Sequence, residues 1–304
     1  MPTDPIILTL AHSPDPDDAF MWWPLGDVDK GIAPKIDTGP YRFRMVADDI
    51  QSLNTRAVDV GDLDITALSF HAYAHCGDRY ALTRCGASFG DGYGPKIVAR
   101  QPMTVEQLGA PGVGIAIPGE RTTAYLTMRL MMGGADPVTV EMPFHEIIEA
   151  VRTGNGGAID AGIVIHEAQL TYADVGLHLV VDLGVWWHGQ TGLPLPLGAN
   201  AVLRDLDARF GAGTIHRVAD VLRDSIAYAN AHRADGLAIA EGFAQPGTTA
   251  DQADRFVAMY VNDLTMDAGE RGERAVAELM KRGAARGFIP RVGDVRMVGT
   301  RRSE

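Results

Sequence analysis

The sequence has few cysteines and no sign of a secretory leader. Only two of its 304 residues are cysteines, Cys76 and Cys85, and they lack the CxxC spacing of a zinc or redox site. Two cysteines form at most one disulfide, so a reducing cytoplasm is the expected location. The first residues carry no basic segment ahead of the short apolar run at 6–11, a pattern that does not fit a secretory signal.

Positive charge is also scarce, with 27 Lys and Arg against 39 Asp and Glu and a net charge of −12. Because nucleic-acid binding needs clustered basic side chains, we expect no nucleic-acid partner. No apolar run is long enough for a membrane-spanning helix, so we expect no membrane partner. The basic residues near the end of the chain are interpreted as a solvated tail without a function: Arg291, Arg296, Arg301 and Arg302.

Composition and length favour a two-lobed globular protein. Hydrophobic residues make up 46% of the chain and charged residues 22%, as in ordinary soluble domains. At 304 residues a single hydrophobic core is near its upper size limit, so two lobes are expected. The sequence has neither an HExxH zinc motif nor a GxSxG nucleophile elbow. We therefore expect no metal and no serine-hydrolase chemistry.

Short apolar runs alternate with helical patterns along the first two thirds of the chain. The runs expected to form buried strands are 6–11, 43–47, 63–68, 80–85, 96–100, 113–118, 138–142 and 161–165. Amphipathic stretches expected to be helical are 48–58, 122–132 and 145–154, and Thr104 with Gln107 forms a capping box. This alternation predicts an α/β fold with parallel-rich sheets, helices on both faces and a helical C-terminal third.

One unit of this pattern occurs twice. A helix end, a glycine, an acidic residue and a buried strand follow one another at 57–68 and again at 150–164. Such units are common in α/β proteins, but two copies about a hundred residues apart favour two lobes of similar construction.

Two loops rich in Gly and Pro, 86–95 and 189–198, suit a pair of crossovers between the lobes. We therefore predict a large lobe of residues 1–99 and 196–304, a small lobe of residues 100–195, and a cleft between them. This is the type II architecture of the periplasmic binding proteins, whose lobes close on a ligand by hinge motion.

A helix start is one candidate ligand contact. Residues 119–124 follow the predicted strand 113–118 and open a helix. The N–H groups of such a turn, with the hydroxyls of Thr122 and Thr123, suit a ligand carboxylate. The alternative, equally favoured by the sequence, is that Thr122 only caps the helix.

His166 is the candidate base among nine histidines. It follows the predicted strand 161–165, at the carboxyl edge of a sheet where α/β proteins bind ligands. A neutral imidazole accepts a proton near pH 7. His71 has a comparable place in the other lobe, whereas His145 starts a helix and is interpreted as a surface or capping residue.

Three acids follow the first predicted strand in the segment 13–20. Ser13 or Asp15 can cap the next helix, and Asp17 and Asp18 suit its first turn. Acids so close together would repel an anionic ligand unless they point outward. We therefore interpret the segment as structural first and cleft-lining second.

Seven segments form a combination more specific than any one of them. In chain order they are SPDPDDAF (13–20), DDIQSLNTRA (48–57), DITALSFHAYA (64–74), RYALTRCGASFGDGYGP (79–95), IAIPGERTTAYL (115–126), DAGIVIHEAQLTY (160–172) and DLGVWWHGQTGLPLPLG (182–198). Together they resemble the 1,4-dihydroxy-6-naphthoate synthase family, lyases of the futalosine route to menaquinone. The last third matches only in general pattern, best at 260–276. One departure is Asp17, where the family often has Asn.

The resemblance implies a periplasmic-binding-protein-like fold used as an enzyme. The substrate would be cyclic dehypoxanthinyl futalosine, a small-molecule carboxylate, and the products 1,4-dihydroxy-6-naphthoate and a small carbon fragment. The family's proton acceptor corresponds to His166. Its substrate-binding segments correspond to Thr66, Ala67 and Leu68 in one lobe and to Thr123 and Ala124 in the other, and their neighbours Ser69 and Thr122 complete the predicted set.

The predicted mechanism is acid–base lysis without a cofactor, in which His166 removes a proton and a carbon–carbon bond breaks as a second ring becomes aromatic. Tyr125, Glu167 and Tyr172 are candidates for the acid that protonates the leaving fragment. The alternatives are a non-catalytic solute-binding protein of the same fold and the sister dehydratase that acts on chorismate. The segments 86–95 and 165–172 favour the naphthoate synthase. The oligomeric state is left open.

Overall fold

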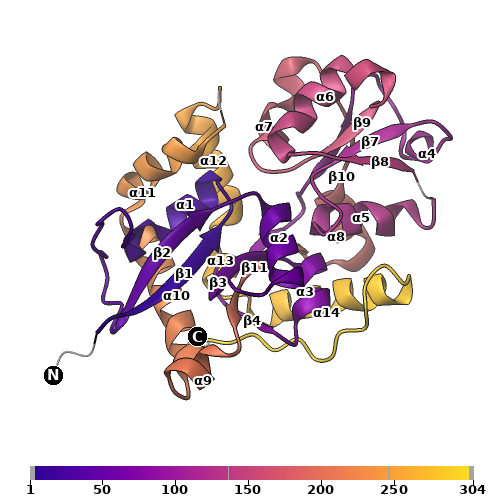
Figure 1. Ribbon diagram of the computed structural model, residues 1–304. Helices are drawn as coiled ribbons and strands as arrows, with labels where there is room; N and C mark the ends of the chain where they lie inside the picture. The colour runs from indigo at the N-terminus through magenta and orange to yellow at the C-terminus, as the bar shows by residue number, and fades with distance from the viewer. Residues whose placement is uncertain (1–3, 136, 246, 301–304) are drawn as a thin grey trace.

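A computed structural model describes residues 4–135, 137–245 and 247–300 of the chain. Arg301 and Arg302 of the predicted basic tail lie outside the described residues. The chain forms two β-sheets with helices packed around them, and Figure 1 shows the two sheets in separate lobes, with the magenta and pink middle of the chain in one of them. An α/β fold with two lobes is therefore confirmed.

The first sheet is built from the start of the chain and one later strand. Its strands are β1 (Ile6–His12), β2 (Tyr41–Ala47), β3 (Ile65–Ser69), β4 (Tyr80–Leu82), β5 (Ser88–Gly90) and β11 (Leu195–Leu203). They are ordered β2-β1-β3-β11-β4, and β5 also pairs with β11. β1 runs parallel to β2 and β3, whereas β11 is antiparallel to its partners.

The second sheet has the same arrangement. Its strands are β6 (Lys96–Ala99), β7 (Gly114–Ile117), β8 (Val138–Glu141), β9 (Ala161–Val164) and β10 (His178–Asp182). From its β8 edge the order is β8-β7-β9-β6-β10. β7 is parallel to β8 and β9, and β6 is antiparallel to β9 and β10. Each sheet thus has three parallel strands and an antiparallel strand at a crossover, so both sheets are mixed.

The repeated sequence unit occupies equivalent places in the two sheets. Asp64, before β3, accepts a hydrogen bond from the Thr9 N–H through Oδ2 at 2.9 Å. Asp160, before β9, accepts one from the Gly114 N–H in the same way at 3.1 Å. The acid therefore ties β3 to β1 in one lobe and β9 to β7 in the other. The predicted similarity of the lobes agrees with the fold.

The chain crosses between the sheets after β5 and returns through α8 (Leu183–Thr191) into β11. Residues 96–99, assigned above to the large lobe, form β6 in the second sheet, so the first crossing precedes Lys96. The loops at 86–95 and 189–198 contain these passages, but they also contain β5 and the start of β11. The sequence analysis missed these strands because glycine and proline are rare inside strands. In the pairing of β11 with β5, a register shift between Pro196 and Gly198 accommodates these residues.

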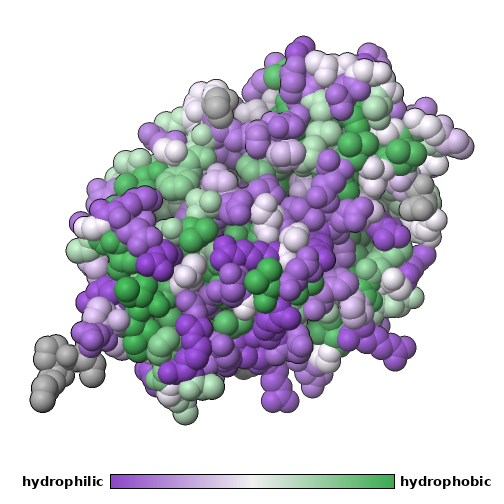
Figure 2. Space-filling model, viewed as in Figure 1, coloured by the Kyte–Doolittle hydropathy of each residue, from purple (hydrophilic) through white to green (hydrophobic). Residues whose placement is uncertain are grey.

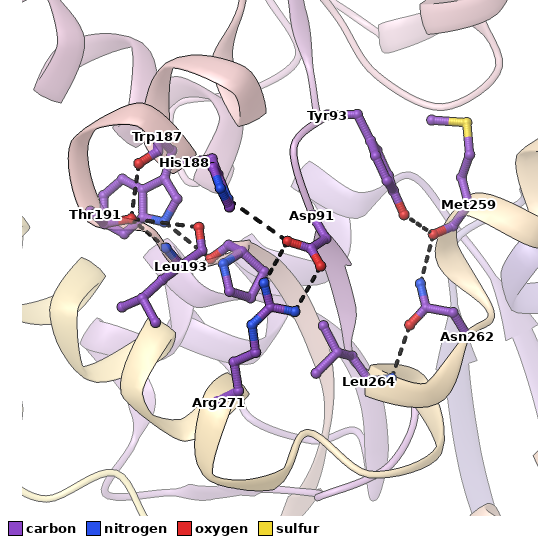
Figure 3. Close-up of polar contacts among 11 residues, drawn as sticks. Asp91, Tyr93, Trp187, His188, Thr191, Leu193, Met259, Asn262, Leu264 and Arg271 are labelled. Carbon is purple, nitrogen blue, oxygen red and sulfur yellow. Dashed lines mark hydrogen bonds and ion pairs between the residues drawn. The ribbon is translucent and has the colours of Figure 1, made fainter.

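Side chains tie the two crossovers to the C-terminal helices (Figure 3). Asp91 on the first crossover accepts two hydrogen bonds from the Arg271 guanidinium, at 2.7 and 2.8 Å. His188 of α8 lies 3.8 Å from the same carboxylate. On the other side, the Tyr93 hydroxyl and the Asn262 amide both donate to the Met259 carbonyl. The crossovers are thus anchored to one lobe.

Helices form where the sequence predicted them in the middle of the chain. The three amphipathic stretches become α2 (Ile50–Asp59), α5 (Thr123–Met132) and α6 (Ile147–Thr153). The capping box of Thr104 and Gln107 opens α4 (Val105–Leu108). The remaining helices before the last third are α1 (Pro16–Trp22), α3 (Phe70–Cys76) and α7 (Ala168–Thr171).

The second sheet has helices on both faces, and its strands alternate accordingly. Val98 and Ala116 pack with Ile147 of α6 in one buried cluster. Their neighbours Ile97 and Ile115 belong to the main core with Leu126 of α5 and Trp187 of α8. The predictions that 138–142 and 43–47 are buried strands were wrong: β8 and β2 are edge strands of the two sheets, Val138 is 58% exposed, and of residues 43–47 only Phe43 is buried.

The last third is helical, as predicted. It consists of α9 (Leu206–Phe210), α10 (Thr214–Ala231), α11 (Arg233–Ala240), α12 (Ala250–Tyr260), α13 (Asp263–Met266) and α14 (Gly269–Ala285). α10 packs on α1 and β11, α12 packs on α1 and β5, and α14 contacts both β11 and α5. This segment therefore completes the first lobe and also reaches the second.

Within the described residues, no helix has the length and apolar character that crossing a membrane requires. Hydrophilic residues are spread over the whole face visible in Figure 2, with smaller hydrophobic areas between them. This face has the mixed surface common on globular proteins, on which scattered apolar side chains are normal.

Candidate active site

A cavity of about 120 Å³ lies between the two sheets. The first lobe and the last third contribute Ser13, Asp15, Asp17, Asp18, Ile50, Ala67, Leu68, Ser69, Gly86, Ser88, Leu197, Gly198, Ala199, Asn200, Phe256 and Tyr260. The second lobe and the first crossover contribute Pro95, Thr122, Thr123, Ala124, Ile165, His166 and Gln169. Both lobes therefore build one site.

Most of the predicted site residues line this cavity. Ala67, Leu68 and Ser69 approach it from the end of β3, and Thr122, Thr123, Ala124 and His166 approach it from the other lobe. Thr66 is not among the lining residues. Its side chain is fully buried, and its hydroxyl donates to the Ala67 carbonyl at 2.9 Å. Thr66 therefore supports the strand end rather than facing the cavity.

The hydroxyls at the start of α5 are already used within the protein. Thr122 Oγ1 accepts from the Tyr125 N–H at 3.3 Å and donates to the Gly119 carbonyl at 2.8 Å. Thr123 Oγ1 donates to the Leu197 carbonyl at 2.5 Å and accepts from the His71 N–H. The capping interpretation of Thr122 is thus correct. The first-turn N–H groups of Thr123 and Ala124, which have no intrahelical acceptor, are the donors left for a ligand.

Asn54 of α2 is a residue that the sequence analysis missed. Its side-chain oxygen accepts from the Ser69 N–H at 2.9 Å, and its nitrogen donates to Ser69 Oγ at 3.0 Å and to the Arg121 carbonyl at 3.3 Å. Ser69 is thereby fixed with its own hydroxyl proton free to donate. Asn54 lies in a predicted amphipathic helix and in the resemblance segment 48–57, but neither pattern carries a signal for a long-range contact.

His166 lines the cavity and is held between two aromatic rings. Its ring centroid lies 4.5 Å from that of Phe144 and 6.3 Å from that of Phe256. Nδ1 lies 2.9 Å from Asp15 Oδ2. Nε2 is buried and has no hydrogen-bond partner among the described residues. Burial opposes the charged ring, but the Asp15 carboxylate outweighs this effect and raises the pKa of His166 above its ordinary value.

The three acids of segment 13–20 are buried and line the cavity rather than pointing outward, so both the structural and the cleft-lining role predicted for the segment occur. Asp15 does cap α1, since it accepts from the Asp18 N–H at 3.1 Å. Burial and the neighbouring Asp15 charge raise the pKa of Asp17 well above its ordinary value and that of Asp18 to about 8. Although burial opposes it, the His166 charge lowers the pKa of Asp15 to about 2. The charged forms of Asp17 and Asp18 are therefore disfavoured, which weakens the repulsion of anions.

Asp15, Asp17 and His166 are also the group within the described residues that could hold a metal ion, with ligand atoms within 4.8 Å of one another. Two carboxylates and an imidazole form a donor set that divalent transition metals accept. In this arrangement, however, Nδ1 of His166 and Oδ2 of Asp15 bond to each other. A metal would have to break that pair.

The candidates for the general acid lie away from the cavity. Tyr125, Glu167 and Tyr172 are not among its lining residues. Glu167 is buried, and its Oε1 accepts from the Gln245 N–H at 3.2 Å. The tyrosine that lines the cavity is Tyr260, whose hydroxyl donates to Gln169 Oε1 at 2.9 Å.

The remaining histidines of interest are structural. His71 is buried in α3, and its Nδ1 lies 3.2 Å from the Thr122 carbonyl. Burial lowers the pKa of His71 to about 4, so its ring is neutral and joins the two lobes. His145 is exposed, as predicted, in a short 3₁₀ turn before α6.

A protein family described as menaquinone biosynthesis matches residues 8–285. Two curated relatives are named 1,4-dihydroxy-6-naphtoate synthase. The one from Thermus thermophilus is 39% identical over 281 residues, covering 92% of this chain and 95% of the relative. The one from Streptomyces coelicolor is 37% identical over 291 residues, covering 94% and 96%.

Solved structures confirm the type of fold. Protein AF1704 from Archaeoglobus fulgidus is 40% identical, with a TM-score of 0.81 over 93% of this chain and 98% of that protein. The Candida albicans CA3427 gene product, described as having the generic periplasmic binding protein fold, is 11% identical, with a TM-score of 0.67 over 95% and 93%. The predicted periplasmic-binding-protein-like fold is therefore confirmed.

Proposed function

This chain belongs to the menaquinone biosynthesis family, and on that premise we propose that it is a 1,4-dihydroxy-6-naphthoate synthase, a carbon–carbon lyase. The relatives that carry this name match it over nearly their full length. The observation that carries the proposal is the buried Nε2 of His166, which has no partner among the described residues and belongs to a side chain that lines the interlobe cavity.

The proposed substrate is cyclic dehypoxanthinyl futalosine. His166 takes a proton from the substrate through Nε2, electrons move toward the ring system, and a carbon–carbon bond breaks as the second ring becomes aromatic. A positioned base of this kind contributes about 10²–10⁴-fold to the rate. Aromatisation supplies driving force, so the remaining task of the protein is to orient the substrate and exclude water.

The proposed carboxylate contacts come from both lobes. The N–H groups of Thr123 and Ala124 carry the partial positive charge of a helix N-terminus, and the Ser69 hydroxyl faces them from the end of β3. The cavity of about 120 Å³ is smaller than the roughly 300–1,000 Å³ of common small-molecule pockets. The lobes therefore have to move apart for the substrate to enter.

Two broader expectations remain part of the proposal. Cys76 and Cys85 are buried and unpaired, which supports a reducing compartment, and we place the reaction in the cytoplasm. The net charge of −12 supports a small-molecule substrate rather than a nucleic acid.

The test is to incubate the purified protein with cyclic dehypoxanthinyl futalosine and to follow naphthoate formation by chromatography. We expect the wild type to form the product and His166→Asn to lose about 10²-fold or more of the rate while still binding substrate. Asn is chosen because the backbone φ of His166 is +53°, a conformation that Asn tolerates better than most residues. His145→Asn, at an exposed histidine, is the matched control and should retain the wild-type rate.

Other results would identify the alternatives. Full activity in His166→Asn would exclude this residue as the base. Consumption of chorismate instead of the futalosine would identify the sister dehydratase, and tight binding of a carboxylate that is recovered unchanged would identify a solute-binding protein.

A further inference from the structure

The candidate base and its hydrogen-bond partner come from opposite lobes. His166 follows β9 of the second sheet, whereas Asp15 follows β1 of the first sheet and is the N-cap of α1. Their side chains meet across the cavity, with Asp15 Oδ2 and His166 Nδ1 separated by 2.9 Å. The pair therefore depends on how the two lobes are placed relative to each other.

Asp15 is fixed on its own side of the cavity. The side chain is 4% exposed. Its second oxygen, Oδ1, accepts a hydrogen bond from the Asp18 N–H at 3.1 Å. This bond satisfies one of the amide groups that the first turn of a helix leaves without a carbonyl. The carboxylate cannot rotate away from His166 without uncapping α1.

The His166 side is fixed by backbone and packing. Its φ of +53° is rare for a residue with a side chain, and such a conformation persists only where the surroundings hold it. Phe144, from the same lobe, and Phe256, from α12, lie next to its ring. With Nδ1 directed at a carboxylate, that nitrogen carries the proton in the neutral ring, and the lone pair is on Nε2. Nε2 is the atom without a partner among the described residues.

From this geometry we propose that Asp15 is a positioning residue: it holds His166, from the opposite lobe, in the tautomer with the proton on Nδ1 and the basic lone pair on Nε2. This inference rests on the proposed function, in which Nε2 takes the substrate proton. It adds that the base is complete only when the lobes are close enough for the two side chains to meet.

Neighbouring contacts hold the lobes in this arrangement. Close to the pair, the Tyr260 hydroxyl of α12 donates to Gln169 of α7 at 2.9 Å, and this bond is buried. The Gln51 side chain of α2 also accepts from the Arg121 N–H of the second lobe at 3.1 Å. Two further sets of interlobe hydrogen bonds therefore accompany the pair.

The acidic groups near His166 differ in the direction in which their pKa is shifted. The acids near its ring are Asp15, Asp17, Asp18, Asp49 and Glu167. Burial raises the pKa of the last four, whereas the pKa of Asp15 is lowered. Among these acids, Asp15 is therefore the one whose removal should lower the His166 pKa most.

The experiment measures the ring directly by NMR of protein labelled with ¹⁵N-histidine. The His166 signals are assigned by their loss in His166→Asn, and ring ¹⁵N shifts distinguish the two tautomers. We expect the Nδ1–H tautomer in the wild type, with protonation at a pH above the ordinary pKa of His. In Asp15→Asn the His166 pKa should fall and the tautomer preference should weaken. Asp15→Ser also preserves an N-cap oxygen and should behave in the same way. It provides the same test if Asp15→Asn does not fold.

The kinetic consequence is a loss in kcat with little change in KM. We expect a loss of tenfold or more, about the loss seen when the partner that orients a functional histidine is removed. The acidic limb of the kcat/KM profile should move to lower pH together with the NMR titration. Asp64→Asn, which removes a buried acid of the same lobe that bonds Thr9 and Arg209, should leave the His166 signals unchanged.

An unchanged His166 pKa and tautomer in both Asp15 variants would overturn the proposal, whatever happens to activity. The NMR measurement requires no turnover. If the wild type forms no naphthoate but the His166 signals respond as expected, the proposed function fails and the positioning role of Asp15 stands.

Discussion

At the scale of single residues, the acids at the start of α1 are distinguished by their surroundings rather than by their type. Asp15 faces the His166 imidazole, whereas Asp17 and Asp18 lie near Asp15, and burial with that neighbouring charge raises the pKa of both. A protonated Asp17 is uncharged and close in shape to Asn. This agrees with the departure noted at that position, where the resembled family often has Asn. Their neutrality allows three acids to line one cavity.

Asp18→Asn tests this account through stability. The pKa of Asp18 is about 8 in the folded protein and near 3.8 in the unfolded chain. Between these values the folded state retains a proton that the unfolded state has lost, so this group makes stability fall as pH rises. Asn removes that dependence and can still accept from the Ser13 N–H, which Asp18 Oδ2 does at 2.8 Å. In urea titrations, we expect the free energy of unfolding of the variant, relative to that of the wild type, to rise from pH 4 to pH 8.

Asp207→Asn is the matched control. Asp207 accepts from the Ile215 N–H at 2.9 Å, and this bond lowers its pKa. Asp207 therefore makes stability depend on pH only below about pH 4. The free energy of unfolding of its variant should differ from that of the wild type by a constant amount from pH 4 to pH 8. A constant difference for Asp18→Asn as well would show that Asp18 is ionised in the folded protein.

At the scale of elements, the two crossovers touch at glycines. A Cβ on Gly184 of α8 would lie 1.8 Å from the carbonyl oxygen of Tyr93 on the first crossover. Backbone at such close approach cannot give way as the end of a long side chain can. The absence of a side chain at Gly184 therefore lets α8 begin directly beside the other crossover, and this contact fixes the place where the chain passes between lobes.

Gly184→Ala should separate the crossovers and destabilise the protein by about 1–3 kcal/mol, the range of overpacking in a closely packed contact. Gly189→Ala is made in the same helix, where a Cβ would meet no atom within 4 Å. That change should stabilise the protein by up to about 1 kcal/mol, because Ala is the better helix former. Thermal unfolding followed by circular dichroism measures both, and equal melting temperatures would refute the role given to Gly184.

At the scale of the whole molecule, the structure represents the lobes close together. Gln51 of α2 contacts both Glu141 and the Arg121 N–H of the second lobe. Arg121 in turn reaches Asp59 at 3.0 Å. The Arg121–Asp59 pair is half exposed, so it contributes little by itself. Together these bonds close one rim of the cavity, while Asp15 and Tyr260 bond across the deeper part.

Gly119→Ala should hinder this closure. Gly119 has φ +144°, and a Cβ there would lie 2.3 Å from Oε1 and 2.6 Å from Cγ of Gln51 in the opposite lobe. The whole Gln51 side chain, and not only its tip, would therefore have to leave its bond with the Arg121 N–H. We expect a larger radius of gyration by small-angle X-ray scattering and a lower kcat/KM for naphthoate formation. Gly112→Ala, with φ +87° and no atom within 4 Å, carries comparable backbone strain without an interlobe contact and should scatter like the wild type. Identical scattering of both variants would contradict the closing role of Gly119.

Much of the fold follows from local signals. Alternation and short apolar runs located all eight expected strands, six of them in buried places, because side chains alternate along a strand whatever its partner. The same signals placed β2 and β8 in the interior, since an apolar, β-branched run does not tell an edge from a centre. β5, β10 and β11 were missed, because glycine, proline and charged residues interrupt the apolar run on which the prediction relied.

The sequence by itself determined the two-lobed α/β class, the helical last third and the positions of His166, Ser69 and the start of α5 at strand ends and a helix start beside the cavity. It could do so because strand ends at one sheet edge form sites in such folds, and because the motifs carry a family resemblance. Only the tertiary structure decided that the Thr122 and Thr123 hydroxyls are occupied, that Asn54 holds Ser69, and that Asp15 reaches His166. These contacts join residues far apart in the chain, and no local periodicity records them. The charge of each acid follows from the burial that such contacts create.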